Sequence, residues 1–129
     1  MKYNVKLTST IVIVLVLALL VYYAYYYARA SPYIINPDLA KKLLKMNEFN
    51  VVLDVRTDLE RNTLGFYPGS VHIQSSDLEK QMPLQFPDKN IKIIAYCNTG
   101  HRAKMATNKL HQLGYKNSVY IATTYTSLL

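Results

Sequence analysis

The stretch IKIIAYCNTGHR, residues 91–102, decides the fold: an apolar run ends at Cys97, and a polar loop then leads into a helical pattern. A thiol at such a junction would lie at the positive end of a helix dipole, below backbone N–H groups that have no intrahelical partner. His101 and Arg102 add positive charge in the same loop, and Gly100 permits a tight turn. The sequence therefore predicts a nucleophilic Cys97. The alternative is a small residue buried in the core.

Outward from this loop, apolar runs of strand length alternate with helical patterns. The predicted strands are 51–55, 71–73, 91–96 and 118–121, and the predicted helices are 37–45, a short one that begins at Ser76 or Asp77 and stops before Pro83, and 102–113. The polar stretch 56–58 is expected to be a loop, Met105 to face inward, and Gly114 to end the last helix. This alternation predicts an α/β domain with a mainly parallel sheet.

The amino-terminal segment is strongly apolar, with no charge from Ile11 to Ala28. It fits a membrane span, and it also fits a signal peptide with Lys2 and Lys6 as its basic region and residues 28–30 as a cleavage site. The tyrosines of residues 22–27 resemble an interfacial aromatic belt and favour the uncleaved anchor. Both interpretations place the following domain outside the cytoplasm. An exported soluble form after cleavage is the alternative location.

Composition narrows the classes of function. Three positive charges, Lys2, Lys6 and Arg29, flank the apolar segment, so the net charge of +7 leaves +4 for the remainder. The remaining lysines form no basic run, so nucleic acid is not an expected partner. A single cysteine excludes an intramolecular disulfide, and no Cys and His cluster has metal-ligand spacing. We expect one domain at 37–129, a linker at 31–36 and a membrane anchor or signal segment at 1–30.

Two chemically interesting side chains follow predicted strands. Asp54 and Cys97 both lie where open α/β sheets place their ligands, at the carboxyl edge. Asp54, close to Arg56, is expected to be a structural acceptor that holds loops together, with a general base as the alternative. His72 is expected to be a half-buried turn residue and His111 to be solvated.

Several segments resemble the rhodanese-like sulfurtransferases, in particular the small, exported single-domain type. The resemblance extends from Pro37 to Leu129, and the segments that carry it are VLDVR (52–56), GFYPGSVHI (65–73), Asp88-Lys89, YCNTG (96–100) and LGY (113–115). It implies a three-layer α/β domain with a mainly parallel central sheet, here preceded by a hydrophobic helix.

The resemblance also implies an activity. Cys97 would take a sulfane sulfur from a small anion such as thiosulfate and pass it from a persulfide to a thiol or cyanide acceptor, without cofactor or metal. Asp54 and Arg56 would brace the loop. The loop residues that would bind the sulfur are Asn98, Thr99, Gly100, His101, Arg102 and Ala103.

Two features bear on this expectation. Thr123-Thr124 stands where the family usually has Gly-Gly, so a membrane-tethered binding or sulfur- and redox-sensing module with little turnover is the alternative. Cysteine phosphatases on a related fold place five residues between cysteine and arginine, whereas four separate Cys97 from Arg102. The shorter loop favours a sulfane sulfur over a phosphate ester.

Overall fold

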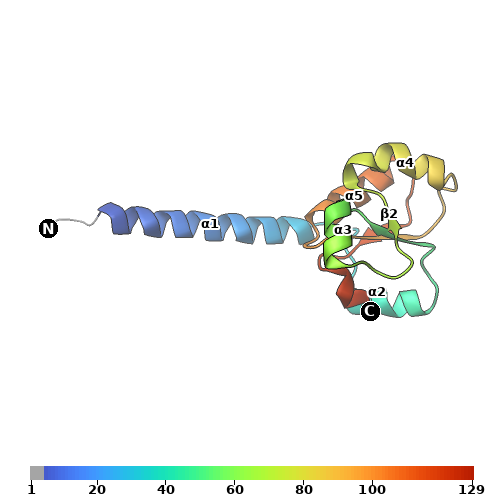
Figure 1. Ribbon diagram of the computed structural model, residues 1–129, viewed down its shortest axis with the longest axis horizontal. Helices are drawn as coiled ribbons and strands as arrows, with labels where there is room; N and C mark the ends of the chain where they lie inside the picture. The colour runs from blue at the N-terminus through green and yellow to red at the C-terminus, as the bar shows by residue number, and fades with distance from the viewer. Residues whose placement is uncertain (1–4) are drawn as a thin grey trace.

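The computed structural model describes residues 5–129, so Lys2 of the predicted basic flank lies outside the described residues. A long helix, α1, projects from a compact α/β domain (Figure 1). The elements in chain order are α1 (Val5–Arg29), α2 (Pro37–Lys45), β1 (Val51–Asp54), α3 (Asp58–Leu64), β2 (Val71–His72), the 3-10 helix η1 (Ser75–Asp77), α4 (Leu78–Gln85), β3 (Ile93–Tyr96), α5 (His101–Gln112), β4 (Ser118–Tyr120) and the 3-10 helix η2 (Tyr125–Leu128).

The four strands form one parallel sheet in the order β2-β1-β3-β4. Asp54 is opposite Tyr96 in the register of β1 and β3, so the two strands end level. The loops after them therefore leave the sheet at the same edge. This confirms the predicted parallel α/β sheet and brings the two candidate strand ends together.

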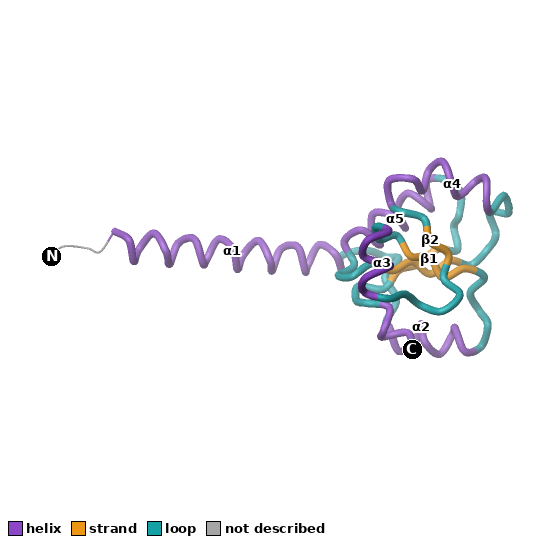
Figure 2. The backbone as a smooth tube through the Cα atoms, in the orientation of Figure 1, coloured by secondary structure: helices purple, strands orange, loops and turns teal. Residues whose placement is uncertain are grey.

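Helices cover both faces of the sheet, which gives the predicted three layers (Figure 2). Because successive strand residues point to opposite faces, Ile93 and Ala95 join the core under α4 and α5, whereas Ile94 and Tyr96 pack toward α2 and η2. All four residues of β3 are buried. Burial on both faces explains why this strand is an uninterrupted apolar run.

Two local features differ from the prediction. Arg56 and Thr57 form the predicted loop after β1, but Asp58 already begins α3, a helix that was not predicted, because Thr57 and Glu60 form a capping box at its start. The short helix α4 continues past Pro83 to Gln85. Proline removes only its own N–H donor, and Phe86 N still donates to Met82 O at 2.8 Å.

Two side-chain environments also differ from expectation. Met105 is 50% exposed on the surface of α5 and does not face inward. His111 is half-buried instead of solvated: its Nε2 lies 2.9 Å from Ser118 O, and its ring stacks on Tyr33. Tyr33, far from His111 in the sequence, contributes to its burial, whereas Met105 lies on the side of α5 away from the buried Ala103, Ala106 and Leu110.

Residues 31–36 run along the outer edge of β4. Tyr120 N donates to Tyr33 O at 3.0 Å, and Ile35 N donates to Tyr120 O at 2.9 Å. Asn36 then caps α2 through hydrogen bonds to its side chain from Asp38 N and Leu39 N. These contacts fix the path from α1 into the domain. The division into segments 1–30, 31–36 and 37–129 stays a prediction.

Candidate active site

Cys97 lies directly after β3 and is almost fully buried, with 1% of its surface exposed. Its Sγ accepts hydrogen bonds from Gly100 N at 3.1 Å and Ala103 N at 3.4 Å. Both donors belong to the beginning of α5, a helix of 12 residues, where the helix dipole is positive. Backbone N–H groups aimed at one sulfur atom favour negative charge on that atom.

Gly100 holds the loop in the conformation that makes these contacts possible. Its φ of 104° lies in the left-handed region, which side chains with a Cβ seldom adopt. A Cβ at this position would lie 2.6 Å from Ala122 Cα and 2.7 Å from Ala122 Cβ. Both the backbone angle and the close approach of Ala122 therefore require glycine here.

Asp54 and Arg56 form a buried ion pair beside the loop. Asp54 Oδ2 accepts from Arg56 Nη2 at 2.8 Å, from Tyr96 Oη at 2.9 Å and from Arg61 Nη1 at 3.1 Å. Burial acts to raise the pKa of Asp54, but the hydrogen bonds from Arg56 and Tyr96 outweigh it, so the pKa lies below its usual value. Asp54 is thus a charged acceptor whose oxygens are engaged.

The ion pair connects to the loop through one side chain. Arg56 Nη1 donates to Asn98 Oδ1 at 3.3 Å, and Asn98 Nδ2 donates to Glu60 Oε1 at 2.9 Å. Arg102 closes the circuit, because its two Nη atoms donate to the two Glu60 carboxylate oxygens at 2.6 Å each. Polar groups from β1, α3 and α5 therefore hold both ends of the loop.

Glu60 is the site residue that sequence reasoning missed. The hydrogen bonds from Arg102, together with those from Thr57, outweigh burial and lower the pKa of Glu60 from 4.5 to about 2. Its carboxylate also accepts from Thr57 N at 3.0 Å and Thr57 Oγ1 at 2.9 Å. The pattern Thr57-Asp-Leu-Glu60 is a capping-box signature and could have revealed both α3 and its acidic residue.

The remaining loop side chains face α1. Thr99 and His101 line a mostly apolar hollow together with Ala28 and Arg29. The ring of His101 lies 5.6 Å from that of Tyr27, measured between centroids. His101 is exposed, whereas the Arg102 side chain is paired with Glu60. Of the two basic side chains in the loop, only His101 is free of a carboxylate partner in residues 5–129.

The threonines that replace the family's glycines adopt ordinary backbone angles. In the described part of the chain, Asn47 is the one residue other than glycine with positive φ. Thr124 has a φ of −71°. The conformation that glycine would permit is therefore not required at residues 123–124.

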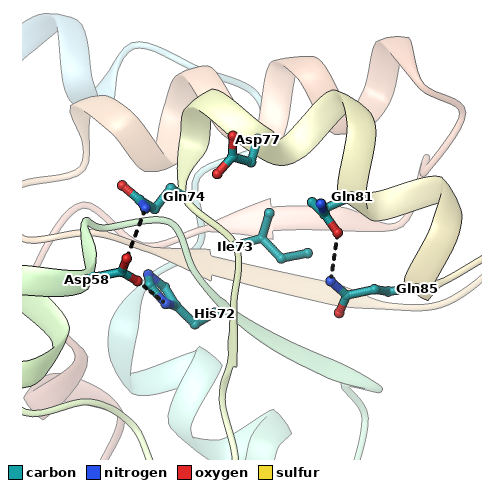
Figure 3. A pocket seen from close by; sticks show the side chains of 7 residues that line it. All are labelled: Asp58, His72, Ile73, Gln74, Asp77, Gln81 and Gln85. Carbon is teal, nitrogen blue, oxygen red and sulfur yellow. Dashed lines mark hydrogen bonds and ion pairs between the residues drawn. The ribbon is translucent and has the colours of Figure 1, made fainter.

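A polar hollow lies apart from Cys97, between β2 and α4 (Figure 3). Asp58 pairs with His72 Nδ1 at 3.3 Å and accepts from Gln74, and His72 Nε2 lies 2.8 Å from Arg56 O. His72 thus lies in β2 and is half-buried, and it contacts the backbone of Arg56, the partner of Asp54 in the buried ion pair. Residues 5–129 contain no group of three His, Cys, Asp or Glu side chains arranged to hold a metal.

Comparison with known proteins adds a family and a set of structural neighbours. The model of the rhodanese-like domain family matches residues 36–124. The structure is similar to a human single-domain sulfurtransferase, with 26% identity and a TM-score of 0.62 over 76% of this chain and 95% of that one. It is also similar to a rhodanese-related protein from Thermoplasma volcanium, with 28% identity and a TM-score of 0.56 over 69% of this chain and 85% of that one.

A third neighbour shares the fold at lower identity. It is a Rhodopseudomonas palustris protein of unknown function, described as a possible tyrosine phosphatase, with 23% identity and a TM-score of 0.68 over 81% of this chain and 85% of that one. No curated protein matches the sequence. These likenesses confirm the predicted fold and its relation to small single-domain sulfurtransferases.

Proposed function

The chain belongs to the rhodanese-like domain family, and from this premise we propose that it is a sulfurtransferase that carries a sulfane sulfur on Cys97. One observation carries the proposal: Cys97 Sγ accepts hydrogen bonds from Gly100 N and Ala103 N at the beginning of α5. Donors placed in this way stabilise a thiolate and, equally, the terminal sulfur of a persulfide.

The reaction has two displacement steps. The Cys97 thiolate attacks the outer sulfur of thiosulfate, the S–S bond of the donor breaks, and sulfite leaves with the bonding electron pair. Cys97 then carries a persulfide. In the second step an acceptor thiolate or cyanide attacks the outer sulfur, and the Cys97 thiolate is released as the leaving group.

The other residues of the loop supply binding and position. The backbone N–H groups from Asn98 to Ala103 surround the transferred sulfur, and the exposed His101 attracts an anionic donor. Asp54 and Arg56 do not contact the transferred sulfur; they position the loop, because Asp54 holds Arg56 and Arg56 holds Asn98. No step requires a metal or cofactor.

We place this reaction on a membrane-anchored protein with its domain outside the cytoplasm. Helix α1 is long and apolar enough to cross a bilayer by length and composition. Release of a soluble exported domain after cleavage near residues 28–30 is the alternative.

Intact-mass measurement on the full chain in detergent tests the function. After incubation with thiosulfate, we expect a gain of about 32 Da, one sulfur atom, that disappears on addition of cyanide. The Cys97→Ser chain should show no gain. Failure of a folded wild-type sample to gain sulfur would contradict sulfur transfer from thiosulfate.

The same experiment distinguishes the sulfurtransferase from the second candidate function, a binding or sensing module with little turnover. The near-complete burial of Cys97 favours slow exchange. A persulfide that forms and then resists both cyanide and small thiols would support the module. Repeated release of thiocyanate would support the enzyme.

A further inference from the structure

The last turn of α1 is packed into the domain. Ala28 is buried, with 2% of its surface exposed, and its carbonyl accepts a hydrogen bond from the Tyr120 hydroxyl. Lys104 Nζ, on α5, donates to Tyr27 O at 2.7 Å and lies 3.3 Å from the centroid of the Tyr27 ring. Arg29 Nη2 donates to Ala122 O at 3.1 Å.

These contacts lie beside the Cys97 loop. Ala122, which holds Arg29, is the residue against which Gly100 packs. Thr99 and His101 line the hollow beside Ala28. The end of α1 is thus a neighbour of the candidate active site, on the side of the domain from which the helix projects (Figure 1).

Removal of α1 would disrupt this arrangement. Cleavage after residue 30 would take away the acceptors of the Tyr120 hydroxyl and of Lys104, a side chain that is only 7% exposed. Buried polar groups that lose their partners destabilise the folded state. A segment with such specific contacts is expected to remain attached.

The length of α1 leaves no spacer between a bilayer and the domain. A hydrocarbon core of about 30 Å requires about 20 helical residues, so Val5 to Ala24 would span it, with Lys6 within reach of the interface at one end and Tyr22 and Tyr23 at the interface at the other. The remaining residues, 25–29, add roughly 7 Å, about the thickness of one headgroup layer. Tyr22, Tyr23 and Tyr26, each more than 60% exposed, lie at the level where an aromatic belt is expected.

From this continuity we propose that α1 remains attached and that the face formed by Tyr23, Tyr27, His101 and Met105 rests on the phospholipid headgroup layer. These four side chains lie around one hollow between α1 and α5. Met105 is half exposed there, next to the Tyr27 hydroxyl. The lipid interface accounts for an exposed methionine and tyrosines on one face. The proposal rests on the membrane anchoring that we propose above.

The orientation restricts how substrates reach the loop. The side of the Cys97 loop that Thr99 and His101 form would face the bilayer, so a donor or acceptor that enters on this side does so along the bilayer surface. Thiols or sulfane sulfur carriers held at the membrane are therefore the favoured reaction partners.

Tryptophan quenching in vesicles tests the orientation, because the chain contains no tryptophan. The full chain with Met105→Trp is reconstituted into phosphatidylcholine and phosphatidylglycerol vesicles that carry a spin-labelled headgroup. The matched control is Leu84→Trp, at a site 72% exposed on α4, whose end lies opposite α1 (Figure 1). We expect several-fold stronger quenching at position 105 than at position 84.

Equal weak quenching at both positions, or loss of residues 1–30 from the membrane-derived protein by intact mass, would overturn the proposal. So would a position-105 signal that responds to protein concentration instead of lipid quencher, since a second copy would then cover this face. Lys104→Met should reduce quenching at position 105, whereas Lys109→Met, at an exposed site on the same helix, should not. Thiosulfate adduct formation in the same samples reports the proposed function separately.

Discussion

Replacement of Glu60 by glutamine removes the charge that holds Arg102. In Glu60→Gln the side chain keeps its size and one oxygen, so α3 retains part of its cap. The bidentate ion pair with Arg102 is lost, and Asn98 loses its charged acceptor. We expect a less stable domain and a less well positioned Cys97 loop.

The magnitude follows from the pKa. Arg102, with a smaller contribution from the Thr57 hydrogen bonds, lowers the pKa of Glu60 from 4.5 to about 2, which corresponds to about 3 kcal/mol of stabilisation of the ionised form by all of these contacts together. The Glu60 side chain is 25% exposed, and glutamine keeps one hydrogen bond, so we expect a loss of about 2 kcal/mol at pH 7.

The sign of the pH dependence is defined by the direction of the shift. A carboxyl group whose pKa is lower in the folded state stabilises the fold above its ordinary pKa of 4.5. That contribution decreases as the pH falls from 4.5 toward 2. The stability difference between wild type and Glu60→Gln should therefore be constant near pH 7 and fall below half of that value at about pH 3.

Urea unfolding of the full chain in detergent, followed by the near-ultraviolet circular dichroism of its tyrosines, measures this difference. Glu79→Gln is the matched control, because Glu79 is 70% exposed and its contact with Lys109 is 3.4 Å long. The control should change stability by less than about 1 kcal/mol at any pH. Equal losses in both variants, or a Glu60→Gln loss that persists unchanged at pH 3, would refute the reasoning.

Three further outcomes follow from the same site. Gly100→Ala should unfold at a lower urea concentration and form the persulfide more slowly, since its Cβ would clash with Ala122. A wild-type urea midpoint together with a wild-type rate of sulfur gain in the intact-mass assay would show this to be wrong. Asp54→Asn should lose about 3 kcal/mol or more by urea unfolding, because Arg56 would be left buried without its counter-charge, and an unchanged midpoint would contradict this. The chain should not hydrolyse p-nitrophenyl phosphate, and hydrolysis that Cys97→Ser abolishes would place it among the phosphatases.

The strands and the position of the Cys97 loop could be predicted because local pattern determines them. The apolar run that ends at Cys97 is buried on both faces of the sheet, so its composition alone distinguishes it. Gly114 ends α5 with a positive φ of 97°, as predicted. Asp54 was found by its position at a strand end, a consequence of parallel topology.

The polar circuit around the loop depends on pairs far apart in the chain. Glu60 meets Arg102 and Asn98 only because β1 and β3 are neighbours in the sheet. Met105 was misplaced although the helical period itself puts it on the side of α5 away from the buried Ala103, Ala106 and Leu110. Sequence periodicity describes one element at a time, whereas the polar contacts around the loop arise where three elements meet.

The contacts of Arg102 favour the proposed sulfurtransferase over a cysteine phosphatase. A phosphatase uses its loop arginine to bind the oxygens of a phosphate ester, which requires a guanidinium that faces the ligand. In this chain both Nη atoms of Arg102 are occupied by Glu60, and only four residues separate it from Cys97. The loop is left with backbone N–H donors around one sulfur atom. That arrangement supports the proposed transfer of a single sulfane sulfur, and the contacts of Arg102 with Glu60 assign the arginine to holding the loop in place.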